Sequence, residues 1–295
     1  MVYETRVEKA LVTRVLDMVS VGRYNVLKVI NHTKFGLYLN GGKYGQIFLP
    51  NRYIPKHVPS EDQGWIKVFI YLDRDDKLIS TTEAPKVQVG EFASLKVIEV
   101  NSIGIFLDWG LPKDLLLPYS EEKHQMAVGE YCVVRVYLDK HTGRVTATEN
   151  LDLYLDNTPA HYKVGQEVDL LVAESTDMGF KAIINNNHWG LIHKNEVFKF
   201  LRPGKEDKGF IREVRSDGKI SLSLQPVGRE ASSILKSKIL DMLHENNGAL
   251  PVSDKSAPAV ISRLFGVSKA NFKKAIGALY KQGKIVISAD SIEIN

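Results

Sequence analysis

The stretch Val21–Val29, VGRYNVLKV, returns as VGEFASLKV over 89–97 and as VGQEVDLLV over 164–172. In each copy a second glycine follows the opening glycine after 14 residues, at Gly36, Gly104 and Gly179. Short β-branched and aromatic runs, separated by Gly, Asn and Asp turns, complete five strands within about 65 to 70 residues. A unit of this size suits a small closed barrel of the OB type and is too short for an immunoglobulin-like sandwich. The first three quarters of the chain are therefore predicted to be one β-domain repeated three times.

The pattern changes beyond residue 228, where apolar residues recur at helical spacing from Ile234 to Leu243. Pro258 is expected at the start of a second helix, and Ser268 is expected to be the N-cap of a third. Two β-runs, KIVIS and SIEIN, close the sequence. This order of elements is typical of a winged helix-turn-helix.

The predicted fold is mainly β with a C-terminal α+β module: three tandem five-stranded OB-type barrels followed by a winged helix-turn-helix. The expected domains are an N-terminal extension over 1–17, barrels over 18–86, 87–160 and 161–228, and the winged helix over 229–295.

Composition indicates an ordinary globular protein, since 44% of the 295 residues are hydrophobic and 25% are charged. The single cysteine, Cys132, excludes a disulfide scaffold. No apolar run reaches the roughly 18 residues of a membrane span, and no signal-peptide core is present. These features predict a cytoplasmic protein without a membrane partner.

The net charge of +4 is unevenly distributed. Residues 18–86 and 229–295 each carry ten basic and six acidic residues, whereas residues 87–160 carry six and eleven, and residues 161–228 ten and nine. Phosphate contacts supply most of the nonspecific free energy of nucleic-acid binding. A polyanion is therefore expected to prefer the first barrel and the C-terminal domain.

The strongest candidate site lies in the first repeat. Strict alternation would send Phe35 and Tyr38 to opposite faces of a strand, but a bulge or bend at Gly36 would bring both rings to one face, beside Phe48 and Lys77. Three rings and an ammonium group would form a platform on which bases stack. The alternative interpretation is that these rings fill the interior of the barrel.

The run Phe35-Gly36-Leu37-Tyr38, followed by Gly45-Gln46-Ile47-Phe48, resembles the S-one-type OB domain, an RNA-binding repeat of the largest small-subunit ribosomal protein and of polynucleotide phosphorylase. The resemblance implies an RNA-binding face at the matching positions, which are Phe35, Tyr38, Phe48, Asp73 and Lys77.

The third repeat resembles the same family through GLIHKNE over 190–196, which is interpreted as placing His193 where Phe48 stands in the first repeat. Lys181, His193 and Lys219 are predicted to contact phosphate there. The second repeat has Ile103, Phe106 and Leu116 at the corresponding positions, within the most acidic segment. We interpret that repeat as structural, either a spacer or a surface that packs against a neighbour.

The order of three barrels and a winged helix, with FGVSKANFKKAIGALYKQGKI in the latter, resembles the conserved virulence factor B family of bacteria over residues 18–295. The resemblance implies an RNA-binding protein connected with post-transcriptional or virulence-gene regulation. In the winged helix, candidate nucleic-acid contacts are Lys269, Asn271, Lys273, Lys274, Lys281 and Lys284. The alternative interpretation is that these lysines do not bind nucleic acid and only form the solvent-exposed face of an amphipathic helix.

An enzyme is not predicted. No phosphate-binding glycine loop is present, and the eight histidines lack metal-ligand spacing. Asp73, Asp75 and Asp76 could suggest a metal-dependent nuclease, but a tight turn between strands explains them better. We therefore expect no catalytic residue, metal or cofactor.

The function predicted from the sequence is binding of single-stranded RNA, with duplex nucleic acid or the ribosome as further partners of the winged helix. Two alternatives remain open: a DNA-binding transcription regulator that acts through the winged helix, and an adaptor of the ribosome or of a protein complex.

Overall fold

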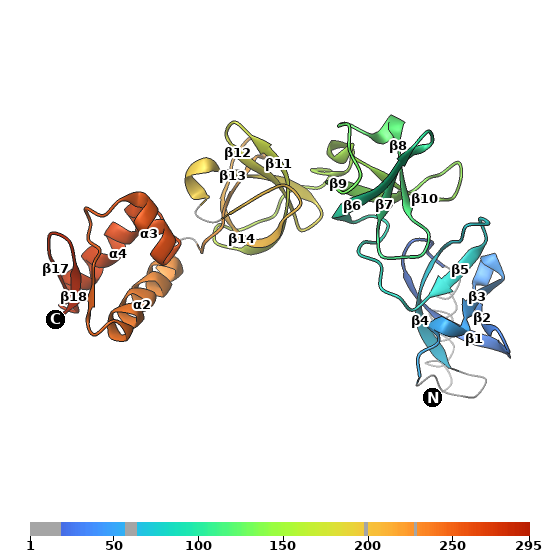
Figure 1. Cartoon of the computed structure of the whole chain (residues 1–295), viewed down its shortest axis with the longest axis horizontal. Helices are drawn as coiled ribbons and strands as arrows, with labels where there is room; N and C mark the ends of the chain where they lie inside the picture. The colour runs from blue at the N-terminus through green and yellow to red at the C-terminus, as the bar shows by residue number, and fades with distance from the viewer. Residues whose placement is uncertain (1–18, 57–63, 198–199, 227–228) are drawn as a thin grey trace, which may run out of the picture. The chain divides into compact units, whose positions relative to one another are not determined.

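The computed structural model describes residues 19–56, 64–197, 200–226 and 229–295. The predicted N-terminal extension over 1–17 lies outside the described residues. The chain divides into two compact units, residues 1–153 and 154–295. The first unit holds two barrels, and the second holds the third barrel and the helical module (Figure 1).

Each barrel is a closed sheet of five strands, and in each the third strand pairs in parallel with the fifth. The first barrel consists of β1 (Tyr24–Thr33), β2 (Gly36–Asn40), β3 (Gln46–Pro50), β4 (Trp65–Leu72) and β5 (Leu78–Thr81). The second consists of β6 (Phe92–Asn101), β7 (Gly104–Asp108), β8 (Leu115–Pro118), β9 (Tyr131–Leu138) and β10 (Val145–Thr148). The third consists of β11 (Glu167–Thr176), β12 (Gly179–Ile184), β13 (His188–His193), β14 (Glu206–Val214) and β15 (Ile220–Ser223).

The repeated second glycine is explained by close packing of β2 against β3 and of the matching strands in the other barrels. A Cβ atom at Gly36 would lie 2.1 Å from the carbonyl oxygen of Leu49, and the corresponding distances are 2.6 Å at Gly104 and 2.0 Å at Gly179. Backbone oxygens cannot move aside as a flexible side chain can, so only glycine fits there. The bulge expected at Gly36 lies instead in β1, between Val29 and Asn31.

Aliphatic side chains fill the interior of the first barrel. Leu37 and Leu39 of β2 and Ile47 and Leu49 of β3 are buried in its core. Because successive side chains of a strand point to opposite faces, the residues between them point outward. The alternative that Phe35, Tyr38 and Phe48 fill the barrel is therefore wrong, since none of the three belongs to its core.

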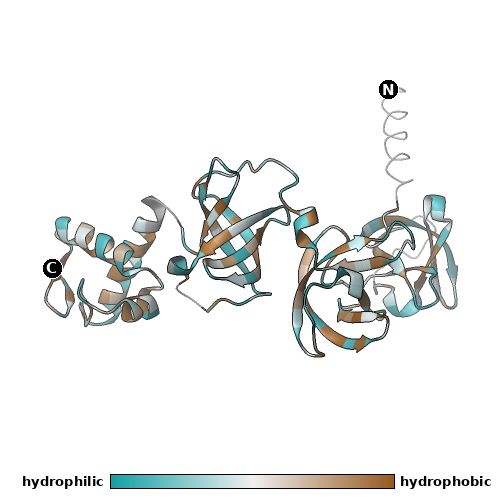
Figure 2. Cartoon of the chain, turned by 90° about the horizontal axis from the view of Figure 1, so that it is seen from above, coloured by the Kyte–Doolittle hydropathy of each residue, from teal (hydrophilic) through white to brown (hydrophobic). Residues whose placement is uncertain are grey.

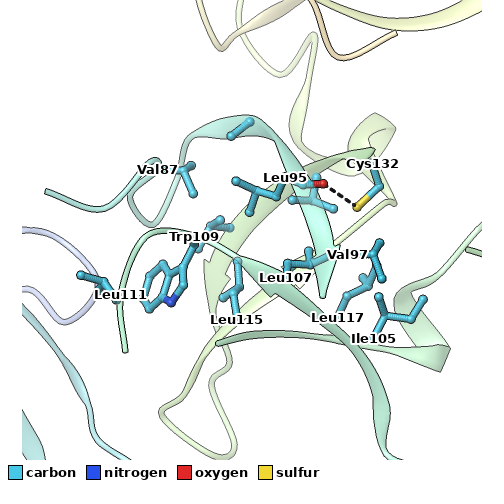
Figure 3. Close-up of a cluster of buried hydrophobic side chains, with 14 of the residues drawn as sticks. Val87, Leu95, Val97, Ile105, Leu107, Trp109, Leu111, Leu115, Leu117 and Cys132 are labelled. Carbon is cyan, nitrogen blue, oxygen red and sulfur yellow. Dashed lines mark hydrogen bonds between the residues drawn. The ribbon is translucent and has the colours of Figure 1, made fainter. Parts of the chain in front are cut away.

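The hydrophobic core of the second barrel extends to the first barrel, whose strand β4 contributes two buried aromatic rings, Phe69 and Tyr71 (Figure 3 shows the second-barrel part). The Trp109 ring lies 5.7 Å from Phe69 and 6.3 Å from Tyr71, both edge-on, as centroid distances. The Val89 N–H also donates to the Gly22 carbonyl at 2.9 Å. Edge-to-face aromatic pairs add to the burial of their own surface, so the two barrels pack as one body.

The C-terminal module is a winged helix, which confirms the predicted fold class. Its elements are α2 (Arg229–Glu245), β16 (Ala249–Leu250), α3 (Pro258–Phe265), α4 (Lys269–Lys281), β17 (Ile285–Ile287) and β18 (Ile292–Ile294). Ser268 is the N-cap of α4, as predicted, because its hydroxyl accepts the Asn271 N–H at 3.1 Å. Gly266 adopts φ 71° at the end of α3, which begins the turn between the two helices. Phe265 and Phe272 stack behind this turn with centroids 4.8 Å apart.

The sheet of the winged helix has three strands, because β16 pairs with β18 beside the predicted terminal hairpin. A two-residue strand carries too little periodicity to be predicted from sequence. Hydrophobic and hydrophilic residues are mixed along the helices (Figure 2), and none of the helices in the described residues is long and apolar enough to cross a membrane.

Candidate nucleic-acid interface

Two aromatic rings lie side by side on the outside of the first barrel. Tyr38 of β2 pairs directly with Phe48 of β3, and their ring centroids are 5.2 Å apart at an angle of 44°. The Phe48 ring passes over Gly36, where an added Cβ would lie only 2.8 Å from its Cε2 atom. Both rings are half-buried. The glycine thus makes room for the ring, and the pair offers an apolar surface to solvent.

Phe35 lies at the rim of this surface, in the turn between β1 and β2, with 67% of its area exposed. The Asn51 N–H donates to the Phe35 carbonyl at 3.0 Å, and the Asn51 amide donates to the Lys34 carbonyl at 2.7 Å. The Lys34 ammonium lies 4.9 Å from the Phe35 ring centroid. The backbone of the turn is therefore held in place while the ring projects into solvent.

Asp73 and Lys77 belong to the turn between β4 and β5. One carboxylate oxygen of Asp73 accepts the N–H groups of Asp75 and Lys77, both at 2.9 Å. Asp73 therefore shapes the turn. Lys77 is exposed and lies two residues before Ile79, the residue of β5 opposite Phe48. The turn interpretation of the three aspartates agrees with these contacts, and no group of acidic, histidine or cysteine side chains within the described ranges could hold a metal ion.

Strand pairing corrects the predicted position of His193. Gly179 pairs with His193 in the third barrel, as Gly36 pairs with Pro50 in the first. His193 therefore corresponds to Pro50, and Leu191 corresponds to Phe48. The prediction was wrong because it counted from Gly190. Gly190, which lies opposite Ala182, corresponds to Ile47, opposite Leu39, and not to Gly45, so that count is displaced by two residues.

The third barrel carries an aromatic residue that sequence reasoning missed. Trp189 lies on the same face of β13 as Leu191 and His193, and the Lys181 ammonium sits 3.8 Å from the centroid of its ring. The alternation of side chains between the two faces of β13 could have predicted that Trp189 lies on this face. Lys219 is 76% exposed, and its ammonium lies 3.7 Å from an Asp217 carboxylate oxygen.

In the winged helix, three of the six candidate residues make local contacts. The Lys273 ammonium pairs with Asp254 at 3.2 Å, and the Lys269 ammonium donates to the Lys255 carbonyl at 3.2 Å. The N–H of Asn271 takes part in the N-cap described above. The remaining candidates are exposed: Lys274, Lys281 and Lys284.

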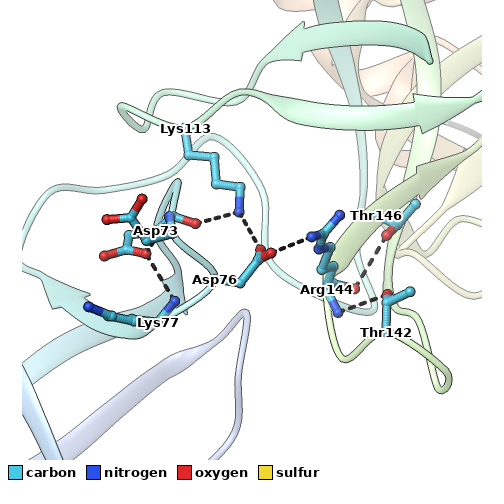
Figure 4. A network of polar contacts seen from close by, with 8 residues as sticks. Asp73, Asp76, Lys77, Lys113, Thr142, Arg144 and Thr146 are labelled. Carbon is cyan, nitrogen blue, oxygen red and sulfur yellow. Dashed lines mark hydrogen bonds and ion pairs between the residues drawn. The ribbon is translucent and has the colours of Figure 1, made fainter.

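Two basic residues of the second barrel, Arg144 and Lys113, contact the turn between β4 and β5 of the first barrel (Figure 4). The Arg144 guanidinium donates to the Asp76 carboxylate, whose other oxygen lies 3.3 Å from the Lys113 ammonium. The Lys113 ammonium also donates to the Asp73 carbonyl at 2.5 Å. The hydrogen bonds from Arg144 and Lys113 lower the pKa of Asp76 below its usual value. The side of the second barrel that carries Arg144 and Lys113 therefore packs against the first barrel. Packing against a neighbour is one of the two roles predicted for this repeat.

Comparison with known proteins identifies both kinds of domain. An S1 domain model matches residues 21–83 and 89–150, and a CvfB-like winged helix domain model matches residues 237–294. Protein YitL of Bacillus subtilis is 30% identical over 276 residues, which cover 91% of this chain and 92% of YitL. Conserved virulence factor B of Staphylococcus epidermidis is 25% identical over 286 residues, which cover 95% and 96% of the two chains.

A crystal structure described as a multidomain protein with nucleic acid binding domains from Streptococcus pneumoniae is 26% identical, with a TM-score of 0.42 and coverage of 93% of this chain and 98% of that one. The fold and the matched domains define a protein of tandem S1-type barrels with a C-terminal winged helix. The chain belongs to the conserved virulence factor B family, which confirms the resemblance found in the sequence. Its domains support nucleic-acid binding, and the families that match are not known enzymes.

Proposed function

We propose that the protein is a cytoplasmic, non-catalytic RNA-binding protein that regulates bacterial gene expression after transcription. Single-stranded RNA stacks on the outer face of the first barrel, and the third barrel and winged helix add contacts to phosphate. The observation that carries the proposal is the pair of outward rings, Tyr38 and Phe48, 5.2 Å apart above a glycine. Bases stack on such rings with little sequence preference.

The charge of the first barrel supports the same proposal. Its residues 18–86 carry a surplus of basic groups, and Lys77 is exposed near the ring pair. Exposed ammonium groups attract the phosphates of a strand whose bases stack nearby. In the third barrel, Lys181, His193 and Lys219 are proposed to take phosphates, with Trp189 as an additional stacking surface.

The regulatory part of the proposal rests on the relatives, several of which are named conserved virulence factor B in staphylococci. A transcription regulator that reads duplex DNA is the second candidate. The observation in its favour is that Lys274, Lys281 and Lys284 are exposed on α4 and at the start of the wing.

Fluorescence anisotropy with a labelled single-stranded RNA and a duplex DNA of matching sequence tests the proposal. Replacing Tyr38 by Ala removes one stacking partner, which is worth about 1 to 3 kcal/mol and corresponds to a loss of roughly 5- to 150-fold in RNA affinity. Tyr38→Phe keeps the ring and is expected to keep most of the affinity.

Tyr131→Ala is the matched control, because Tyr131 is an exposed aromatic residue of the second barrel, away from the ring pair. Equal losses in Tyr38→Ala and Tyr131→Ala, or a preference for the duplex, would refute the proposal. The salt dependence of the affinity gives the number of phosphate contacts. The logarithm of the binding constant falls with the logarithm of the salt concentration, with a slope of about −0.7 for each contact to a single strand.

A further inference from the structure

A second face of the first barrel carries exposed apolar side chains. It lies on β1 and β4, which pair antiparallel (Figure 1), whereas the ring pair lies on β2 and β3. Val26 is 57% exposed, Trp65 46% and Ile30 45%. Exposed apolar surface that is rimmed by polar groups marks sites of interaction with other molecules.

Two lysines stand among these apolar side chains. Lys28 lies opposite Trp65, and Lys67 lies opposite Val26. Side chains at directly opposite positions of paired strands lie on the same face of the sheet. Both lysines are exposed, so their charges meet solvent beside the apolar groups. The β1–β4 face, defined as Val26, Lys28, Ile30, Trp65 and Lys67, therefore has two positive charges and no carboxylate.

The third barrel shows how the same position is neutralised within the chain. Asp169 pairs with Lys208 there, as Val26 pairs with Lys67 in the first barrel. The Lys208 ammonium lies 2.5 Å from a carboxylate oxygen of Asp169 and 3.9 Å from one of Glu167. The hydrogen bond to Asp169 raises the pKa of Lys208. The first barrel thus keeps the lysine but has valine in place of its carboxylate partner.

One carboxylate borders the β1–β4 face. Tyr24 of β1 packs against the core of the second barrel, and the Lys67 ammonium lies 4.6 Å from the centroid of its ring. Burial and the carboxylate of Glu91 raise the pKa of the Tyr24 hydroxyl. Glu91 precedes β6, so this negative charge lies where the first barrel meets the second.

We propose that the β1–β4 face binds an acidic amphipathic segment of another protein. The apolar side chains of that segment cover the exposed apolar groups, and its carboxylates pair with Lys28 and Lys67 in the way that Asp169 pairs with Lys208. Five side chains make a small face, which suits one short helix or strand, because each side of a standard protein interface has about 20 to 30 residues. The inference goes beyond the proposed function, because the ligand is a protein and the face does not include the ring pair.

Protein fits this face better than RNA does. Val26 and Ile30 are aliphatic, whereas the bases of a single strand stack on aromatic rings. Trp65 is the one ring of the β1–β4 face, and the residue opposite it is Lys28. Aliphatic side chains next to an aromatic ring are typical of the core of a protein interface.

Fluorescence anisotropy of a labelled peptide with the full chain tests the inference. The probe is a 14-residue peptide with leucines along one helical face and glutamates beside them, and a second peptide has lysine in place of each glutamate. We expect the glutamate peptide to bind, with an affinity that falls as the salt concentration rises. Trp65→Ala should weaken this binding about tenfold or more, as truncation of a central aromatic residue does in protein interfaces.

Reversal of the charges makes the test specific. The double variant Lys28→Glu and Lys67→Glu should lose the glutamate peptide and bind the lysine peptide. The matched control is the double variant Lys96→Glu and Lys140→Glu, which makes the same change of charge at exposed residues of the second barrel. The control should keep the preference for the glutamate peptide.

The outcomes separate this inference from the proposed RNA site. Trp65→Ala should leave the affinity for single-stranded RNA unchanged, and Tyr38→Ala should leave peptide binding unchanged. The inference is overturned if the glutamate peptide does not bind at millimolar concentration, or if the two double variants behave alike. A loss of RNA affinity in Trp65→Ala would assign the face to RNA instead. A dimer in sedimentation velocity that Trp65→Ala dissociates would assign it to a second copy of the chain, which also overturns the inference.

Discussion

Replacement of Gly36 by Ala tests the packing that brings β2 against β3 and seats the Phe48 ring. The new Cβ would lie 2.1 Å from the Leu49 carbonyl oxygen and 2.8 Å from Phe48 Cε2, so both the backbone and the ring must shift. Overpacking of a closely fitted site costs about 1 to 3 kcal/mol. For a unit of 153 residues, about 2 to 4 °C is lost per kcal/mol, which gives a fall in Tm of roughly 2 to 12 °C.

Differential scanning calorimetry is the assay, and Gly277→Ala is its control. Nothing lies within 4 Å of a Cβ added at Gly277 in the helix α4, so that change should stabilise the winged helix by up to about 1 kcal/mol. Gly36→Ala should also weaken RNA binding, because the Phe48 ring is displaced. An unchanged Tm for Gly36→Ala, or equal shifts for the two variants, would refute the packing argument.

Three further predictions follow from side-chain contacts. Arg144 and Lys113 lower the pKa of Asp76 below 3.8, so the stabilisation from this contact is present at neutral pH and is lost as the pH falls below 3.8 through the lowered value. Asp76→Asn should therefore reduce Tm at pH 7, and the difference from the unchanged protein should shrink as the pH is lowered into the acid range; a difference that does not depend on pH would contradict this. Burial raises the pKa of the Cys132 thiol to about 12, so Ellman's reagent should not react with the folded protein at pH 8. The reagent should titrate one thiol after the protein is unfolded in urea. Rapid reaction of the folded protein would contradict the burial of this thiol. Ser268→Ala removes the N-cap of α4 and should cost about 0.5 to 2 kcal/mol in urea denaturation, whereas an unchanged unfolding midpoint would exclude a contribution from the cap.

The fold could be predicted because its determinants are local and repeated. The glycine offset marks positions where one strand crosses close to the next, as the 2.1 Å approach at Gly36 shows. The alternation of aliphatic residues around Tyr38 and Phe48 decides which face is buried. In the winged helix, Ser268 and Gly266 are capping residues whose roles follow from their own backbone preferences.

Other features depend on pairing between distant segments, which the sequence does not encode locally. The pairing of β12 with β13 matches Gly190 to Ile47 and not to Gly45, so the position predicted for His193 was displaced by two residues. The same pairing places Trp189 on the face of β13 that carries Leu191 and His193. The bulge in β1 arises opposite β2, away from the glycine that suggested it. The contact between Asp76 and Arg144 joins residues 68 positions apart in different barrels, so neither segment alone predicts it.

Photo-crosslinking of a 4-thiouridine-labelled single-stranded RNA to the full-length protein, followed by mass spectrometry of the linked peptides, tests the central claim most directly. Stacking on the first barrel predicts crosslinks to peptides that contain Tyr38 or Phe48, and a loss of these crosslinks in the Tyr38→Ala variant. Crosslinks confined to residues 229–295, and unchanged in that variant, would contradict the claim and would make the winged helix the principal site of binding.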